Sequence, residues 1–147
     1  MERPPPSLLA LDTYLLSRVG KIARSRTGAR LAERGLRLWH LSVLSALGDD
    51  GPAGQRELGV RLRIDPSDMV KVLDELERSG AVRRERDPAD RRRSLVRLTD
   101  AGRTLLRELT AEAAQVTDDL LAPLSPTARA QLHTTLLTLF HHATGTG

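Results

Sequence analysis

The large apolar side chains of this chain are almost all aliphatic, and they recur at helical spacing. Leucine is the most frequent residue, whereas Trp, Tyr and Phe occur once each. Leucine and alanine both favour helices. The first third of the chain carries an apolar stripe at steps of three and four residues: Leu8, Leu11, Leu15, Val19 and Ile22. This spacing predicts one helix from about residue 7 to residue 27.

Turn residues divide the rest of the chain into short elements. Apolar periodicity predicts helices over about 36–47, 55–62, 66–79 and 99–121, and a last helix from about 126. Two short segments predict strands joined by a polar turn: 81–86, where polar residues follow Val82, and 94–99, where Val96 and Leu98 alternate with Arg97. The expected fold is therefore mainly α, with one β-hairpin, in a single domain of 147 residues.

The composition excludes several functional classes. The chain has no cysteine, which excludes disulfides, thiolate metal sites and a cysteine nucleophile. No nucleophile elbow, phosphate loop or HExxH motif occurs, and His133 and His141 have no acidic residue near them in the sequence. We therefore expect no enzyme activity, no metal and no cofactor. No apolar run is long enough for a membrane span and no signal peptide is evident, so we expect a cytoplasmic protein without a membrane partner.

The segment between the two predicted strands is strongly basic. Residues 83–93 contain six arginines, and the last three, Arg91, Arg92 and Arg93, are consecutive. Like charges at the tip of a hairpin repel one another, and guanidinium groups pair well with phosphate. The preceding Asp90 can hold one arginine in a fixed direction. This pattern favours DNA binding, and the alternative is a solvated basic surface.

The two short helices before the hairpin are spaced as in a helix-turn-helix. The outer face of the second predicted helix, 66–79, carries Ser67, Asp68 and Lys71 near its N-terminus, the end that enters the major groove in such motifs. Lys71 can reach a phosphate or a guanine edge. The alternative is that these residues form the solvated face of an amphipathic helix.

Several motifs together resemble the MarR family of bacterial winged-helix transcription regulators. They are QRELG at 55–59, IDPS at 64–67, LDELERSG at 73–80, DPADRR at 87–92 and VRLTDAG at 96–102. The resemblance implies a winged helix-turn-helix lobe over 36–102, with a three-helix core and a two-stranded wing. It also implies dimerisation helices over 7–35 and 103–143, and a homodimer that acts on a palindromic operator in double-stranded DNA.

The resemblance also suggests roles for single residues. Ser67 and Lys71 match contacting positions of the recognition helix, 66–79, expected in the major groove. Asp90 and Arg92 match a wing pair, within 87–93, that places an arginine in the minor groove. Arg84 matches a basic position after the helix-ending glycine.

Two residues depart from the family pattern. Val70 stands where many members have Ser or Thr, and Asp68 is acidic on the reading face. The implied function is sequence-specific regulation of transcription, with repression expected. The alternative is a winged-helix module that binds proteins without specific DNA binding.

The terminal helices carry more apolar surface than one small lobe can cover. Leu9 and Leu16 lie beside the first stripe, and Leu137 lies beside the stripe of the last helix. Such surface favours a two-fold interface over a self-contained bundle.

Relatives bind small anionic or phenolic effectors between the dimer helices and the lobe. The corresponding candidates are Tyr14, Arg18, Trp39, His40 and the neighbouring Ser42. The alternative places Trp39 in the core and makes His40 a surface or capping residue.

Overall fold

The computed structural model describes residues 3–147, which form seven helices and three strands. The elements are α1 (Pro6–Leu9), α2 (Asp12–Ala32), α3 (Leu38–Asp50), β1 (Ala53–Gly54), α4 (Gln55–Leu62), α5 (Pro66–Arg78), β2 (Val82–Arg86), β3 (Ser94–Leu98), α6 (Asp100–Leu120) and α7 (Pro126–Thr144). The predicted fold class, mainly α with a winged helix-turn-helix, is confirmed. None of the described helices combines the length and apolarity that a membrane crossing needs.

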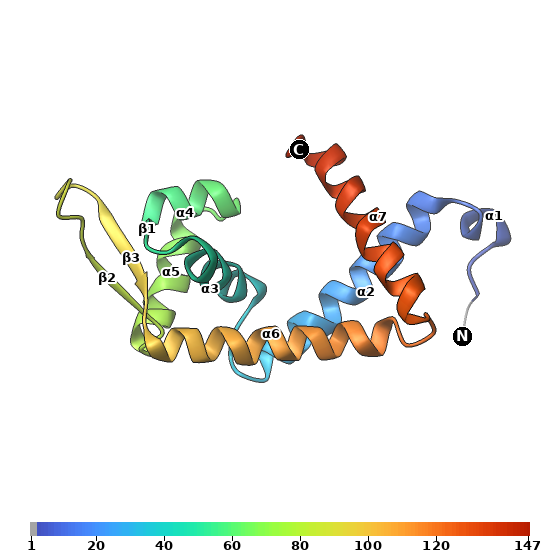
Figure 1. Cartoon of the computed structure of the whole chain (residues 1–147), viewed down its shortest axis with the longest axis horizontal. Helices are drawn as coiled ribbons and strands as arrows, with labels where there is room; N and C mark the ends of the chain where they lie inside the picture. The colour runs from blue at the N-terminus through green and yellow to red at the C-terminus, as the bar shows by residue number, and fades with distance from the viewer. Residues whose placement is uncertain (1–2) are drawn as a thin grey trace.

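The molecule is elongated, and its two ends are built from different elements. Figure 1 shows α3, α4, α5 and the hairpin gathered at one end, and α1, α2 and α7 at the other. The long helix α6 runs between the two ends. Arg34, just after α2, anchors this arrangement because its guanidinium donates to Glu108 at 2.7 Å and to Glu112 at 2.8 Å, both on α6.

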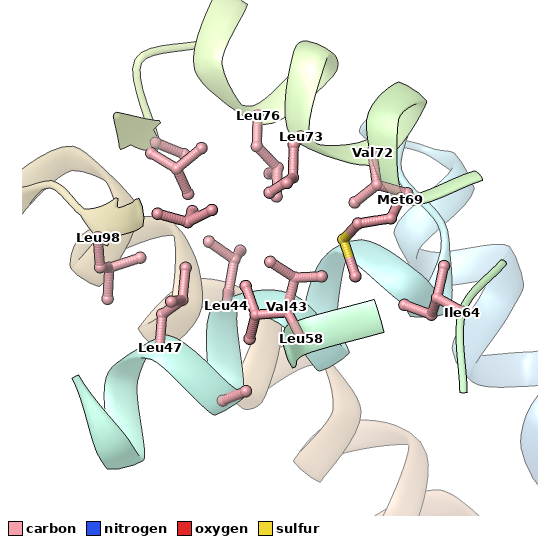
Figure 2. Packing of buried hydrophobic residues seen from close by; sticks show 14 of the residues in the cluster. Val43, Leu44, Leu47, Leu58, Ile64, Met69, Val72, Leu73, Leu76 and Leu98 are labelled. Atoms are coloured by element: carbon pink, nitrogen blue, oxygen red, sulfur yellow. The ribbon is translucent and has the colours of Figure 1, made fainter. Parts of the chain in front are cut away.

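The hydrophobic core lies in the lobe formed by α3, α4, α5 and the sheet. Figure 2 shows aliphatic side chains of α3 and α5 facing each other, with Leu58 of α4 beside Val43 and Leu98 of β3 at the left of the cluster. The apolar face of α5 is fully buried: Met69, Val72, Leu73 and Leu76. Packing of one face is the main source of helix stability in proteins. Because this face of α5 is buried, the opposite face is turned to solvent.

The first helix differs from its prediction as one element over 7–27. The chain leaves the helix at Leu11, which is extended, and α2 begins at Asp12, an acidic residue favourable in a first helical turn. Helix α2 then continues through Gly28 to Ala32, because Leu31 is fully buried in the lobe core. Packing of Leu31 outweighs the local helix-weakening effect of the glycine.

The sheet has one strand more than the predicted hairpin. Ala53 pairs with Val96 and Gly54 with Leu95, so that β1 adds an antiparallel edge and the strand order is β1-β3-β2. A strand of two residues is too short to leave a periodic pattern in the sequence. The strand matters because it ties the base of the wing to the start of α4.

The terminal helices are poorly covered within one chain. None of the residues 126–144 of α7 is buried, and Leu31 is the buried residue of α2. The apolar side chains that remain exposed include Leu15, Val19, Ile22, Leu136, Leu139 and Phe140. The end of the molecule away from the lobe therefore presents an extensive apolar surface.

Candidate nucleic-acid interface

The N-terminus of α5 is a well-formed helix start. Asp65 precedes the helix, and its carboxylate accepts the backbone N–H of Ser67 at 3.0 Å and the Ser67 hydroxyl at 2.6 Å. These two hydrogen bonds hold the pKa of Asp65 below its ordinary value. Pro66 occupies the first helical position, where its missing N–H is harmless. The proton of the Ser67 hydroxyl is used in the hydrogen bond to Asp65. The exposed oxygen can therefore act only as an acceptor for other groups.

The outer face of α5 is open to solvent near this start. Ser67 and Lys71 are exposed, and Asp68 is half-buried. Between them Val70 is 42% exposed, an apolar side chain on an otherwise polar face. Within residues 3–147 no ion pair involves Lys71, so its ammonium group has no acidic partner.

The tip of the wing is ordered by its aspartates. The Asp90 carboxylate accepts the backbone N–H of Arg92 at 3.0 Å, and Asp87 accepts that of Ala89 at 2.9 Å. The expected contact between Asp90 and an arginine side chain is not present: Asp90 holds the backbone of Arg92 and not its guanidinium. Arg91 and Arg92 are exposed, and neither forms an ion pair with another described residue.

Arg93, the third arginine of the tip, is folded back onto the protein. Its guanidinium lies 2.6 Å from the Glu57 carboxylate of α4 and 3.8 Å from Asp87. It also lies so close to Gly54 that a Cβ at that position would be 2.6 Å from Arg93 Nε. Arg93 therefore fixes the wing against β1 and α4, and differs in this respect from Arg91 and Arg92.

Arg84, on β2, is also engaged within the protein. Its guanidinium contacts Asp74 and donates to Glu77 at 3.0 Å, and its backbone N–H donates to Glu77 at 2.8 Å. The backbone and side-chain hydrogen bonds from Arg84 lower the pKa of Glu77. This cluster joins the wing to α5, so Arg84 holds these two elements in position relative to each other. Arg84 differs in this respect from Arg91 and Arg92, which are exposed and form no ion pair with another described residue.

An open groove of about 1410 Å³ lies between the wing, α4 and the first turns of α5. Arg92 and Arg93 line it on the wing side, and Met69 and Val70 line it on α5. Arg56, which sequence reasoning did not single out, lines it from α4. The sequence offered one signal for Arg56: it is the second residue of a short predicted helix, within the QRELG motif. The groove thus joins the two elements expected to contact DNA.

The effector candidates do not line one common groove. A second, smaller groove of about 480 Å³ lies between α2 and the start of α3, and its lining includes Lys21, Arg24, Arg37 and Trp39. Of the predicted residues, Trp39 lines this groove, whereas Tyr14, Arg18 and His40 do not. The guanidinium carbon of Arg37 lies 5.3 Å from the centroid of the Trp39 ring, within range of a cation–π contact.

His40 is engaged in hydrogen bonds within the protein. The side chain is fully buried, and its Nδ1 accepts the backbone N–H of Arg37 at 2.9 Å, which caps α3. Its Nε2 then carries the proton and lies 2.6 Å from the Glu75 carboxylate of α5. His40 therefore caps α3, as the alternative interpretation predicted, and its contact with Glu75 links α3 to α5.

Known proteins share both sequence and fold with this chain. The model of the MarR family matches residues 34–93. The HTH-type transcriptional regulator YkoM of Bacillus subtilis is 33% identical over 68% of this chain, and the match spans 65% of that protein's length. A MarR-family transcriptional regulator from Rhodococcus sp. RHA1 superposes with a TM-score of 0.73, with 31% identity over 86% of this chain and 90% of that one.

A second solved structure is informative about ligands of relatives. CouR from Rhodococcus jostii RHA1, solved with bound p-coumaroyl-CoA, has a TM-score of 0.71 and 32% identity over 90% of this chain and 93% of CouR. The family model and these two structural matches, which extend over most of the chain, agree with the motifs at 55–102. The chain belongs to the MarR family of transcriptional regulators.

Proposed function

We propose that the protein regulates transcription by binding a palindromic operator in double-stranded DNA as a homodimer. The N-terminal half of α5 enters the major groove, and the wing tip, residues 87–93, reaches the adjacent minor groove. The observation that carries the proposal is the groove lined both by α5 and by the wing, with Arg92 among its lining residues and Lys71 exposed directly after the lining residue Val70. Repression follows if the bound dimer blocks RNA polymerase, and the site of action is the cytoplasm.

Charge supports DNA as the partner of this surface. Lys71, Arg91 and Arg92 are exposed without acidic partners among the described residues. Exposed cations neutralise phosphates and release counterions. Asp68 lies half-buried on the same face, where it can accept a hydrogen bond from a cytosine amino group.

The terminal helices support the homodimer. Helix α7 buries none of its residues within one chain, although it carries Leu136, Leu139 and Phe140. A second copy packed through two-fold symmetry covers this surface on both chains at once. In such a dimer the two α5 helices can lie about 34 Å apart, which is one turn of DNA.

Arg92 provides the test of DNA binding. Replacing it by alanine should weaken binding to a selected operator duplex by about 1–3 kcal/mol, as for an arginine placed in a groove. Arg107→Ala is a matched control, because Arg107 is an arginine of α6 that does not line the groove. Fluorescence anisotropy with labelled duplex, repeated over a range of salt concentrations, measures both effects.

Two outcomes would contradict the proposal. Affinity for the duplex must fall steeply as the salt concentration increases, because the release of counterions from DNA becomes less favourable. Binding that ignores salt, together with stable association with a protein partner, favours the alternative of a winged-helix protein-interaction module. Equal duplex affinities for the wild type and Arg92→Ala would remove the wing from the interface.

We further propose that a small aromatic anion controls release from DNA, binding in the groove between α2 and α3. Three cationic side chains, Lys21, Arg24 and Arg37, surround Trp39 there and provide charge and a stacking surface. Binding of p-coumaroyl-CoA by the related CouR gives a precedent for such a ligand. A panel of aromatic carboxylates should quench or shift Trp39 fluorescence and release the operator, and no response across the panel would contradict this site.

A further inference from the structure

Val70 is an apolar residue on the face of α5 that is otherwise suited to polar contacts. Its side chain is 42% exposed, whereas its neighbour Met69 is 1% exposed and belongs to the core. Val70 lies one helical turn after Ser67 and directly before Lys71, and it lines the groove shared with the wing. The packing of the lobe does not account for an exposed valine at this position.

We propose that Val70 determines base specificity by contacting the C5-methyl group of thymine in the major groove. This inference rests on the proposed binding of α5 to DNA. In the major groove, thymine is the base that presents an apolar group, and the other base edges present donors and acceptors. A valine pressed against guanine, cytosine or adenine would remove water from those polar groups without replacing their hydrogen bonds. Val70 therefore both favours thymine and disfavours the other bases.

The neighbours of Val70 strengthen the assignment. The Ser67 hydroxyl donates to Asp65 at 2.6 Å, so it offers an acceptor toward DNA, and Lys71 offers a donor. The three side chains together present an acceptor, an apolar group and a donor along one face of the helix. The cationic groups of Arg56 and Arg92 border the same groove and favour a nucleic acid as its occupant.

The test compares thymine with uracil, which differ by the methyl group alone. The full-length protein first selects its operator from random duplexes, and each thymine of that operator is then replaced by uracil in turn. Loss of one buried methyl group should weaken wild-type binding about fourfold at the contacted thymine. The Val70→Ala variant should bind the thymine and uracil duplexes with equal affinity, near the affinity of the wild type for uracil.

Two further variants separate a base contact from a change in folding. Thr110→Ala is a matched control: Thr110 is an exposed β-branched residue of α6 that does not line the groove, so its replacement should leave the fourfold thymine preference intact. Val70→Thr keeps one methyl group and the shape of the side chain, and should retain a reduced preference. Thermal melting followed by circular dichroism verifies that each variant is folded.

The outcomes distinguish this inference from the proposed function. If the wild type binds no duplex at all, both are wrong. If it binds an operator but tolerates uracil at every position, or if Val70→Ala keeps the full thymine preference, the DNA-binding function stands and the assignment of Val70 is overturned. A fourfold preference that disappears in Val70→Ala and persists in Thr110→Ala confirms it.

Discussion

Gly102 should be essential for joining the wing to α6. It is the third residue of α6, and its backbone N–H donates to the capping hydroxyl of Thr99 at 3.0 Å. A Cβ built on Gly102 would lie 2.0 Å from the carbonyl oxygen of Ala81 and 2.7 Å from Leu98 Cδ1. The first of these atoms is backbone and cannot rotate away. Alanine at 102 must therefore push the start of α6 away from the strand that begins the wing.

The size of the effect follows from what that movement breaks. The Ala81 carbonyl also accepts the Thr99 backbone N–H at 3.1 Å and the Thr99 hydroxyl at 3.0 Å. Overpacking costs about 1–3 kcal/mol, and each weakened hydrogen bond adds about 1 kcal/mol. The higher helix propensity of alanine offsets up to about 1 kcal/mol. We expect Gly102→Ala to lower the free energy of unfolding by about 2–4 kcal/mol.

Urea denaturation at a fixed protomer concentration measures this change, because the stability of a dimer depends on concentration. Gly28→Ala is the matched control: Gly28 is also helical, and a Cβ there meets no atom within 4 Å. That variant should be as stable as the wild type or more stable by up to about 1 kcal/mol. If Gly102→Ala unfolds within about 0.5 kcal/mol of the wild type, the contact with Ala81 does not constrain the junction and the reasoning is refuted.

Two further predictions concern the Arg84 cluster and the dimer. Because Arg84 lowers the pKa of Glu77 from 4.5, the ionised Glu77 stabilises the fold above pH 4.5, and this contribution is lost as the pH falls through the lowered value. Glu77→Gln should therefore flatten the pH dependence of the unfolding free energy below pH 4.5, whereas Glu33→Gln, at an exposed residue, should not. In the proposed two-fold dimer Phe140 would contribute one aromatic contact from each chain, so Phe140→Asp should weaken dimerisation by about 4 kcal/mol, or roughly 1000-fold. Analytical ultracentrifugation measures this change, with Thr138→Asp on the opposite face of α7 as its control; an unchanged dimer would exclude this face from the interface.

Two helices of the lobe, α4 and α5, could be predicted nearly to the residue, and the reason is local, whereas α3 spans Leu38–Asp50 in place of the predicted 36–47. Helix α4 has its predicted bounds, 55–62, and the predicted helix 66–79 differs from α5 by one residue. Both are bounded by residues whose backbone preferences act within a few positions: Pro66 can occupy a first helical position, and Gly80 adopts a positive φ of 82° after the end of α5. Short elements between such residues leave few alternatives.

Features that depend on distant parts of the chain could not be predicted. Helix α2 extends to Ala32 because Leu31 packs into a core built from later segments. His40 could be given a capping role from its position, but not its contact with Glu75, 35 residues further along. The surroundings of the effector candidates show the same limit, since helical position alone did not reveal that His40 contacts α5 while Trp39 lines a groove with α2.

The basic segment 83–93 illustrates how tertiary contacts divide a uniform sequence signal into two roles. Arg84 and Arg93 are held by acids of α5 and α4, so they set the position of the wing relative to the helix-turn-helix. Arg91 and Arg92 form no ion pair within residues 3–147 and remain exposed. An exposed cation binds at a lower cost when its backbone is already held in place, because ordering a flexible segment on binding costs free energy. In the proposed DNA complex the paired arginines therefore position the exposed pair, and replacing Arg93 should displace the tip that carries them.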